Sequence, residues 1–123
     1  MIGYSTLGTN DLERAGKFYD ELLGEIGAKR VMADDHIILW STKPGAAMLA
    51  AITPHNEEPA QPGNGMMTAL LVKDLSTVER MYAKALELGG TDEGAPGPRG
   101  ESGMCFGYCR DLDGNKIAFY CMT

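Results

Sequence analysis

The strongest constraint on the fold is a stretch of sequence that this chain contains twice. Residues 7–27 read LGTNDLERAGKFYDELLGEIG, and residues 70–90 read LLVKDLSTVERMYAKALELGG. The two stretches align without a gap, 63 positions apart, and are identical at six of 21 positions. Because this spacing is about half of the 123-residue chain, it predicts two copies of one structural module.

Each copy opens with a strand-like alternation of residues, which a polar junction ends. In the first copy, Tyr4 and Thr6 fall on one side of the expected strand and Leu7 on the other. Asp11 and Asp74 follow the two expected strands. An aspartate in this place favours the start of a helix, so each strand is expected to lead directly into a helix.

Both expected helices are apolar on one side only. Apolar residues recur three and four positions apart from Leu12 and from Leu75, and both patterns end at glycine. Ser76 and Glu79 have the spacing of a capping box at the start of the second helix. An apolar stripe must pack against another element. A strand, a helix and further strands therefore predict an α+β module in which the helix covers a sheet.

Turn-forming residues divide the rest of the first copy. Residues 28–34 and 36–41 are expected to form a hairpin, and residues 46–53 a further strand. Residues 54–65 (PHNEEPAQPGNG) are expected to be a linker. The chain is therefore interpreted as a single domain, 1–123, with module one at residues 1–53 and module two at residues 66–123. Each module alone would be too small to bury a sufficient core.

In the second copy, strands are expected to begin at Thr91 and to cover residues 104–110 and 116–122. Residues 94–103 (GAPGPRGESG) between them are interpreted as an irregular loop. Two interpretations of this loop remain open. It is either a mobile flap over a pocket or a plain connection within a hairpin.

The charge balance argues against several classes of partner. With a formal net charge of −6, the chain lacks the basic excess with which proteins attract nucleic acid or an anionic membrane surface. No run of about 20 apolar residues predicts a membrane span, and the first residues lack the layout of a signal peptide. We therefore expect a cytoplasmic protein in which Cys105, Cys109 and Cys121 are free thiols.

Each copy is therefore expected to run strand, helix and three strands (βαβββ). Short motifs mark this order: DL opens both helices at residues 11–12 and 74–75, FY lies inside the first helix at 18–19, and DLDGN precedes the final strand at 111–115. Together these motifs resemble the vicinal oxygen chelate superfamily, which includes the glyoxalases, the bleomycin resistance proteins and the extradiol dioxygenases. The resemblance covers essentially the whole chain. It implies two curled sheets around a shared cleft, a divalent metal cofactor in many members, and a homodimer in many.

The resemblance also implies where a metal would be bound. In metal-using relatives, the ligands are a His in the first strand of each module and one residue, often Glu, in the last strand of each. The corresponding positions here are Tyr4, Met67 and Ala118, and the fourth, which is harder to place, is taken as Leu49. These residues do not form the cage of His and carboxylate that such chemistry needs. We therefore expect no metal and no other cofactor.

Strand alternation predicts an apolar cleft that suits an organic molecule. The residues expected to line it are Tyr4, Thr6, Leu49, Ala51, Met67, Ala69, Ala118 and Tyr120. Trp40 is added for stacking on a planar ligand, Arg99 for holding a carboxylate or phosphate, and Tyr108 as a further lining residue. Each also has a structural interpretation: core or dimer packing for Trp40, packing for Tyr108, and a solvated loop position for Arg99.

Three functions remain open at this stage. The first is metal-free binding of a small apolar or aromatic molecule in the cleft. The second is a lyase, isomerase or dioxygenase-type metalloenzyme with non-standard ligands, which His36, Glu101, Asp111 or a cysteine would have to supply. The third is a non-catalytic dimeric interaction domain. We expect the first, because proteins of this fold usually keep a pocket, although fold alone does not determine function.

Overall fold

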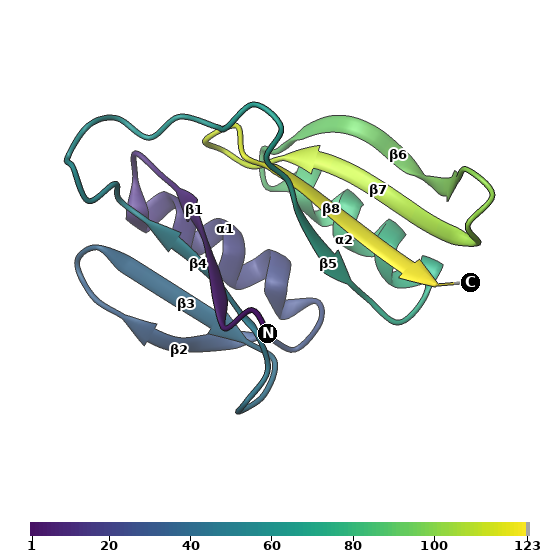
Figure 1. Ribbon diagram of the computed structural model, residues 1–123, viewed down its shortest axis with the longest axis horizontal. Coiled ribbons are helices and arrows are strands. Elements are labelled where there is room, and N and C mark those ends of the chain that lie inside the picture. Colours follow the sequence, from purple (N-terminus) through teal and green to yellow (C-terminus); the bar gives the residue numbers. More distant parts are fainter. Residues whose placement is uncertain (123) are drawn as a thin grey trace. The chain divides into compact units, whose positions relative to one another are not determined.

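The computed structural model of the chain describes residues 1–122, which divide into two compact units (Figure 1). The first unit is Met1–Gln61, and the second begins at Pro62. The boundary between them lies within residues 54–65, the stretch interpreted as a linker. Each unit has one helix and one four-stranded sheet, so the duplication seen in the sequence is a duplication of structure.

The first unit follows the order strand, helix and three strands. Its elements are β1 (Tyr4–Gly8), α1 (Leu12–Gly24), β2 (Lys29–Ala33), β3 (Ile37–Ser41) and β4 (Met48–Ile52). The strands are arranged in the order β1-β4-β3-β2, with β1 and β4 parallel and the other neighbours antiparallel. The parallel pair follows from the helix, since α1 returns the chain to the end of the sheet from which β1 started.

The second unit repeats this arrangement with longer strands. Its elements are β5 (Thr68–Leu71), α2 (Leu75–Glu87), β6 (Thr91–Arg99), β7 (Met104–Arg110) and β8 (Lys116–Met122). The strand order is β5-β8-β7-β6, again with only the first pair parallel. The sequence predicted the bounds of β7 and β8 as they are observed.

Both helices begin at the predicted aspartates. The side chain of Asp11 accepts a hydrogen bond from Arg14 N at 3.0 Å, and that of Asp74 accepts one from Thr77 N at 2.9 Å. The predicted capping box of the second helix is wrong, because Ser76 already lies inside α2. Asp74 is the better cap, since its carboxylate also accepts a bond from the Thr77 hydroxyl. No helix within residues 1–122 is long and apolar enough to cross a membrane.

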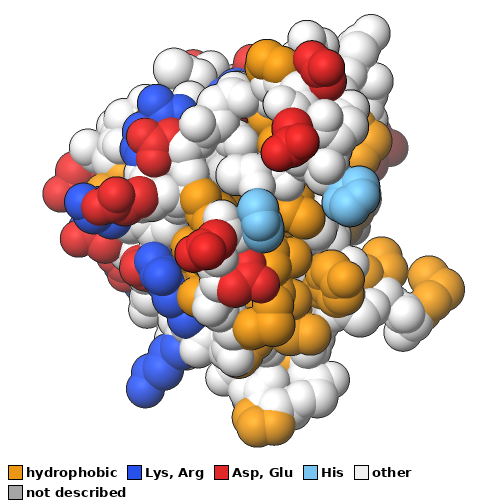
Figure 2. Space-filling view, turned by 90° about the vertical axis from the view of Figure 1, so that its left-hand side faces the viewer, with side chains coloured by type: hydrophobic (Ala, Val, Ile, Leu, Met, Phe, Trp, Pro, Cys, Tyr) orange, Lys and Arg blue, Asp and Glu red, His pale blue; other side chains and the backbone are white. Residues whose placement is uncertain are grey.

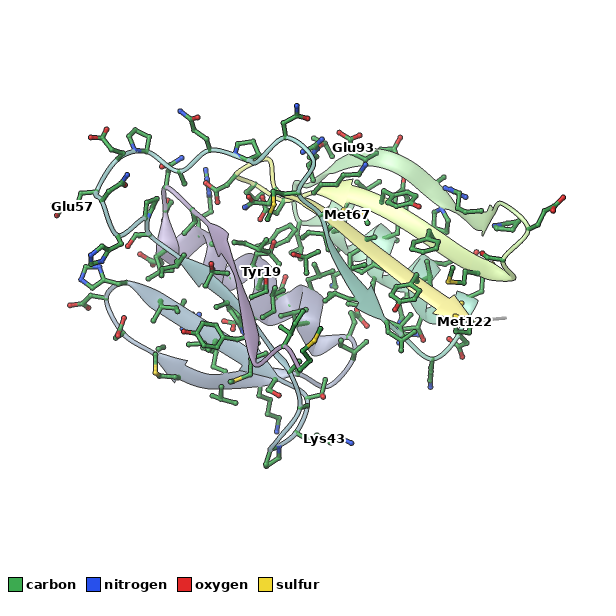
Figure 3. The ribbon with its side chains drawn as sticks, viewed as in Figure 1. Tyr19, Lys43, Glu57, Met67, Glu93 and Met122 are labelled. Atoms are coloured by element: carbon green, nitrogen blue, oxygen red, sulfur yellow. The ribbon has the colours of Figure 1, made fainter. Side chains whose placement is uncertain are left out.

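The core of the first unit lies between α1 and its sheet. Tyr19 projects from α1 into this core (Figure 3) and lies 5.6 Å from the ring of Trp40. Trp40 Nε1 donates a hydrogen bond to Asp20 at 2.9 Å, and Asp20 also pairs with Arg30 at 2.8 Å. One carboxylate on α1 therefore fixes side chains from both β2 and β3 against the helix.

The core of the second unit lies between α2 and the adjacent face of its sheet. Val78, Met81 and Phe119 are fully buried there, and the cysteine thiols of β7 and β8 lie in buried positions. A Cβ added at Gly107 would lie 3.4 Å from Val78, which shows that this position of β7 faces α2. The residues on either side of Gly107 in the strand must then face the other way.

The prediction that residues 94–103 form an irregular loop is wrong for the first six of them. β6 extends to Arg99, and its glycines pair with β7 at Gly94–Tyr108 and Gly97–Phe106, with register shifts between them. Proline and glycine signal a loop locally, but β6 is an edge strand. In an edge strand, only the backbone N–H groups that face its single neighbour are needed for pairing. Proline, which lacks this group, is therefore tolerated at the other positions and at bulges.

Candidate functional site

The face of the second unit's sheet opposite α2 carries several of the candidate ligand-binding residues. We call it the aromatic face and define it by Ala69, Leu71, Phe106, Tyr108, Ala118 and Tyr120. In the register of β7 and β8, Phe106 lies opposite Tyr120, and Tyr108 lies opposite Ala118. Figure 3 is viewed onto this face, with aromatic side chains in front of β7 and β8 and α2 behind the sheet.

Three rings on the aromatic face form a stepped row of parallel planes. The centroids of Phe106 and Tyr120 are 5.0 Å apart with an angle of 11° between the rings. The centroids of Phe106 and Tyr108 are 5.6 Å apart with an angle of 5°. All three side chains are only partly buried. Offset stacking is a favourable aromatic geometry, and a planar ligand could extend such a row.

Two cationic groups lie at the Tyr108 end of the row. The guanidinium carbon of Arg99 is 5.4 Å from the Tyr108 ring centroid, and Lys116 Nζ is 5.3 Å from it. Both distances are within the range of cation–π attraction. Arg110 lies on the same side of β7, but its charge is balanced by Glu93, which accepts a bond from Arg110 Nε at 2.8 Å.

The structure thus brings four of the eight predicted site residues together: Arg99, Tyr108, Ala118 and Tyr120. Met67 immediately precedes β5 and has the strand parity of Ala69, so it belongs to the same side of the chain. Its side chain is 43% exposed. Tyr4, in the first unit, lies on the face of that sheet opposite α1 and is 54% exposed.

Trp40 and Leu49 lie on the other side of the first sheet. They are register partners, and Trp40 packs against α1 with 1% of its surface exposed. The expectation that Leu49 and Ala51 share a face with Tyr4 is therefore wrong. β1 pairs with β4 at Tyr4–Met48, so Thr6 pairs with Ala50. A displacement of one residue moves a strand's side chains to the opposite face, and the sequence alone did not define this register.

The corrected register also changes the fourth position at which a metal ligand would be expected. Thr6 corresponds to Ala69 in the repeat, and Ala69 pairs with Ala118, so the counterpart of Ala118 in the first unit is Ala50. The four positions then hold Tyr, Met, Ala and Ala, and two of these have no donor atom at all. This donor set does not fit the divalent metal that the resemblance implies.

Phe106 was not among the predicted site residues. It occupies the centre of the ring row, between Tyr108 and Tyr120. The sequence could have identified it, because Phe106 is two positions from Tyr108 in the strand MCFGYCR and so faces the same side of the sheet.

Both histidines lie at a hollow of about 830 Å³ in the first unit. His36 follows the turn at Asp34, and His55 lies in the segment after β4. Figure 2 shows the two histidines beside apolar and acidic side chains on this side of the molecule. His36 Nδ1 lies 3.4 Å from the Thr53 hydroxyl, and both histidines are exposed. Glu57, which also lines the hollow, projects away from the unit (Figure 3).

Of the other groups considered for a metalloenzyme, Asp111 has structural partners and the three cysteines are buried, whereas Glu101 is exposed. Asp111 Oδ1 accepts bonds from Asp113 N and Asn115 N, both at 2.9 Å, and so fixes the turn before β8. Burial, together with the negative charge of Asp111, raises the pKa of the Cys109 thiol to about 12. Within the described part of the chain, no group of three His, Cys, Asp or Glu side chains could hold a metal ion.

Comparison with known proteins now identifies the family. A family model for the Glyoxalase/Bleomycin resistance protein/Dioxygenase superfamily matches residues 1–119. The chain belongs to this superfamily. A crystal structure of a glyoxalase/bleomycin resistance protein from Albidiferax ferrireducens T118 has a TM-score of 0.91 and 32% sequence identity. That comparison covers 100% of this chain and 99% of the other.

More distant structures of the superfamily show the same fold. A glyoxalase-related enzyme from Fulvimarina pelagi has a TM-score of 0.78 at 24% identity, covering 98% of this chain and 87% of that one. A glyoxalase/bleomycin resistance protein/dioxygenase family enzyme from Burkholderia phytofirmans PsJN has a TM-score of 0.78 at 14% identity, covering 98% of both chains. No curated protein sequence matches the chain.

Proposed function

We propose that this superfamily member binds a small planar organic molecule on the aromatic face, without the divalent metal that many of its relatives use. The observation that carries the proposal is the row of three partly exposed parallel rings, Phe106, Tyr108 and Tyr120. Tyrosine offers an apolar ring for contact with the ligand and a hydroxyl group that can remain hydrated, which suits a largely apolar binding site with a few polar groups.

The surroundings of the rings support an apolar ligand. Leu71 pairs with Tyr120 in the sheet register and is 62% exposed, and Met122 at the end of β8 is 63% exposed. Large apolar side chains that gather at an exposed face generally mark a surface that something covers. The donor chemistry at the metal positions points in the same direction, since an alanine cannot bind a cation.

Calorimetric titration of chelator-treated protein with a neutral planar probe, 2-naphthamide, tests the proposal. We expect saturable binding that added Zn²⁺ or Mn²⁺ does not strengthen. Phe106→Leu and Tyr120→Leu each remove stacking but keep apolar volume, so each should weaken binding about threefold to tenfold. Tyr82→Leu, on α2, is the matched control and should leave the affinity unchanged. Equal binding by all variants, or binding only with metal, would contradict the proposal.

A second candidate is an interaction domain in which a second copy of this chain covers the aromatic face. The exposure of Leu71 and Met122 favours it, because an isolated protein gains nothing from apolar side chains in water. Sedimentation of the wild type and of Leu71→Lys distinguishes the candidates. A dimer that Leu71→Lys dissociates would support the interaction domain, and a monomer in both would refute it.

A further inference from the structure

We propose that the molecule bound on the aromatic face is an aromatic carboxylate, whose charged group lies at the Tyr108 end of the face, within reach of Arg99 and Lys116. This inference rests on the proposed binding function and names the chemical class of its ligand. Three observations support it. Arg99 and Lys116 both lie at the Tyr108 ring, and the glycines of β6 leave space there for the Arg99 guanidinium. Within residues 1–122, neither cation has an acidic partner.

The sequence has 17 acidic and 11 basic residues, and several of the basic residues pair with a carboxylate. Arg110, on the same side of β7, has one in Glu93. Among residues 1–122, neither Arg99 nor Lys116 has a carboxylate within ion-pair distance, and their charged groups lie 5.4 and 5.3 Å from the Tyr108 ring centroid. Because each cation lies within 5.4 Å of the Tyr108 ring centroid, an anion bound beside that ring would be attracted by both.

The backbone of β6 holds the guanidinium of Arg99 in place. Its Nη1 donates to Pro98 O at 3.1 Å and its Nη2 donates to Ala95 O. A Cβ on Gly94 would lie 3.4 Å from Nη2, and a Cβ on Gly97 would lie 3.4 Å from Nη1. The two glycines therefore leave the space that the guanidinium occupies over Tyr108. A side chain fixed in this way loses little conformational entropy when it binds an anion.

The face is polarised along the ring row. Arg99 and Lys116 lie at Tyr108, while Tyr120 at the other end pairs with the exposed Leu71. A ligand with an apolar ring system and one carboxylate matches this polarity in a single orientation. The carboxylate would lie at Tyr108, and the rings of the ligand would lie against the aromatic face toward Tyr120 and Leu71.

The test compares two probes of the same shape, 2-naphthoate and 2-naphthamide, by calorimetric titration of the full chain. We expect 2-naphthoate to bind at least about tenfold more tightly at low salt, with the difference shrinking as NaCl is added. Lys116→Gln and Arg99→Gln should each weaken 2-naphthoate binding about fivefold and leave 2-naphthamide binding within twofold. Lys43→Gln, an exposed lysine of the first unit, is the control for loss of charge and should change neither.

The outcomes separate this inference from the proposed function. If both probes bind equally well, the carboxylate inference is overturned and the binding function stands. If neither probe binds, the proposed function fails with it. If Arg99→Gln weakens both probes equally and Lys116→Gln weakens neither, Arg99 serves only to shape β6 and the inference is overturned. Arg99→Lys keeps the charge without the planar fork, so partial recovery of 2-naphthoate binding supports the inference.

Discussion

At the scale of single residues, Asp20 shows how one carboxylate stabilises the first unit. Arg30 donates to both of its oxygens, at 2.8 and 2.9 Å, and Trp40 Nε1 donates at 2.9 Å. Partial burial on its own would raise the pKa of Asp20. The hydrogen bonds from Arg30 and Trp40 and the charge of Arg30 lower it by more, so this pKa lies below the ordinary value of 3.8.

Asp20→Asn should therefore lower the free energy of unfolding at pH 7 by about 1–2 kcal/mol. Because the pKa is lowered in the folded protein, the stabilisation is present above pH 3.8 and is lost as the pH falls through the folded-state value. Urea denaturation at pH 7 and pH 3 should show the wild type and variant converging at the lower pH. A difference that is constant with pH would contradict this account, and Asp35→Asn, in an exposed turn, is the control.

Residue type and strand alternation together predicted part of the candidate site. Arg99 was identifiable by its residue type, Ala118 and Tyr120 by alternation, and all three lie together with Tyr108. Trp40 was identifiable only as a rare aromatic residue. Its position against α1 depends on the pairing of β3 with β4, which residue type does not encode.

At the scale of elements, the two halves of the repeat use the same glycine for different physical reasons. Gly27 has a φ of +77°, and nothing lies within 4 Å of the place where a Cβ would be. Gly90 has no such φ, but a Cβ there would lie 2.7 Å from Arg110 O and 2.8 Å from Ala85 O. One glycine is needed for its backbone angle and the other for close approach of main chains.

Alanine substitutions should separate these two requirements. Gly27→Ala should cost about 1 kcal/mol of unfolding free energy, the cost of a side chain in the left-handed region. Gly90→Ala should cost about 2–3 kcal/mol, because the two carbonyl groups must move apart. Gly3→Ala, where a Cβ would meet nothing within 4 Å, is the control and should be neutral. Chemical denaturation measures all three, and equal costs at Gly27 and Gly90 would refute the distinction.

The elements themselves were largely predictable, and their faces only in part. Alternation and helical periodicity are local, so they predicted both helices, their aspartate caps and strands such as β7 and β8. The glycine-rich stretch before Arg99 was interpreted as a loop from its composition. It forms a strand because it pairs with β7, and composition does not encode that pairing. The same reason explains the misplacement of Leu49, since the register of β4 depends on β1.

At the scale of the whole molecule, the chain is a duplicated βαβββ protein of the glyoxalase/bleomycin resistance protein/dioxygenase superfamily whose metal positions lack suitable donors. The repeat and the motifs were sufficient to predict the superfamily from sequence. Strand alternation also predicted that Ala69, Ala118 and Tyr120 share one face, and the pairing of β5 with β8 confirms this. It did not identify Phe106, which lies at the centre of the ring row. We propose that this face of the second unit's sheet binds the ligand.

The most direct measurement is an NMR titration of chelator-treated protein with 2-naphthoate, following the backbone and ring signals of every residue. The account predicts that the largest shift changes fall on β7 and β8, centred on Phe106, Tyr108 and Tyr120, with further changes at Arg99 and Lys116. Changes centred on the hollow at His36 and His55, or changes that appear only after a divalent metal is added, would contradict it.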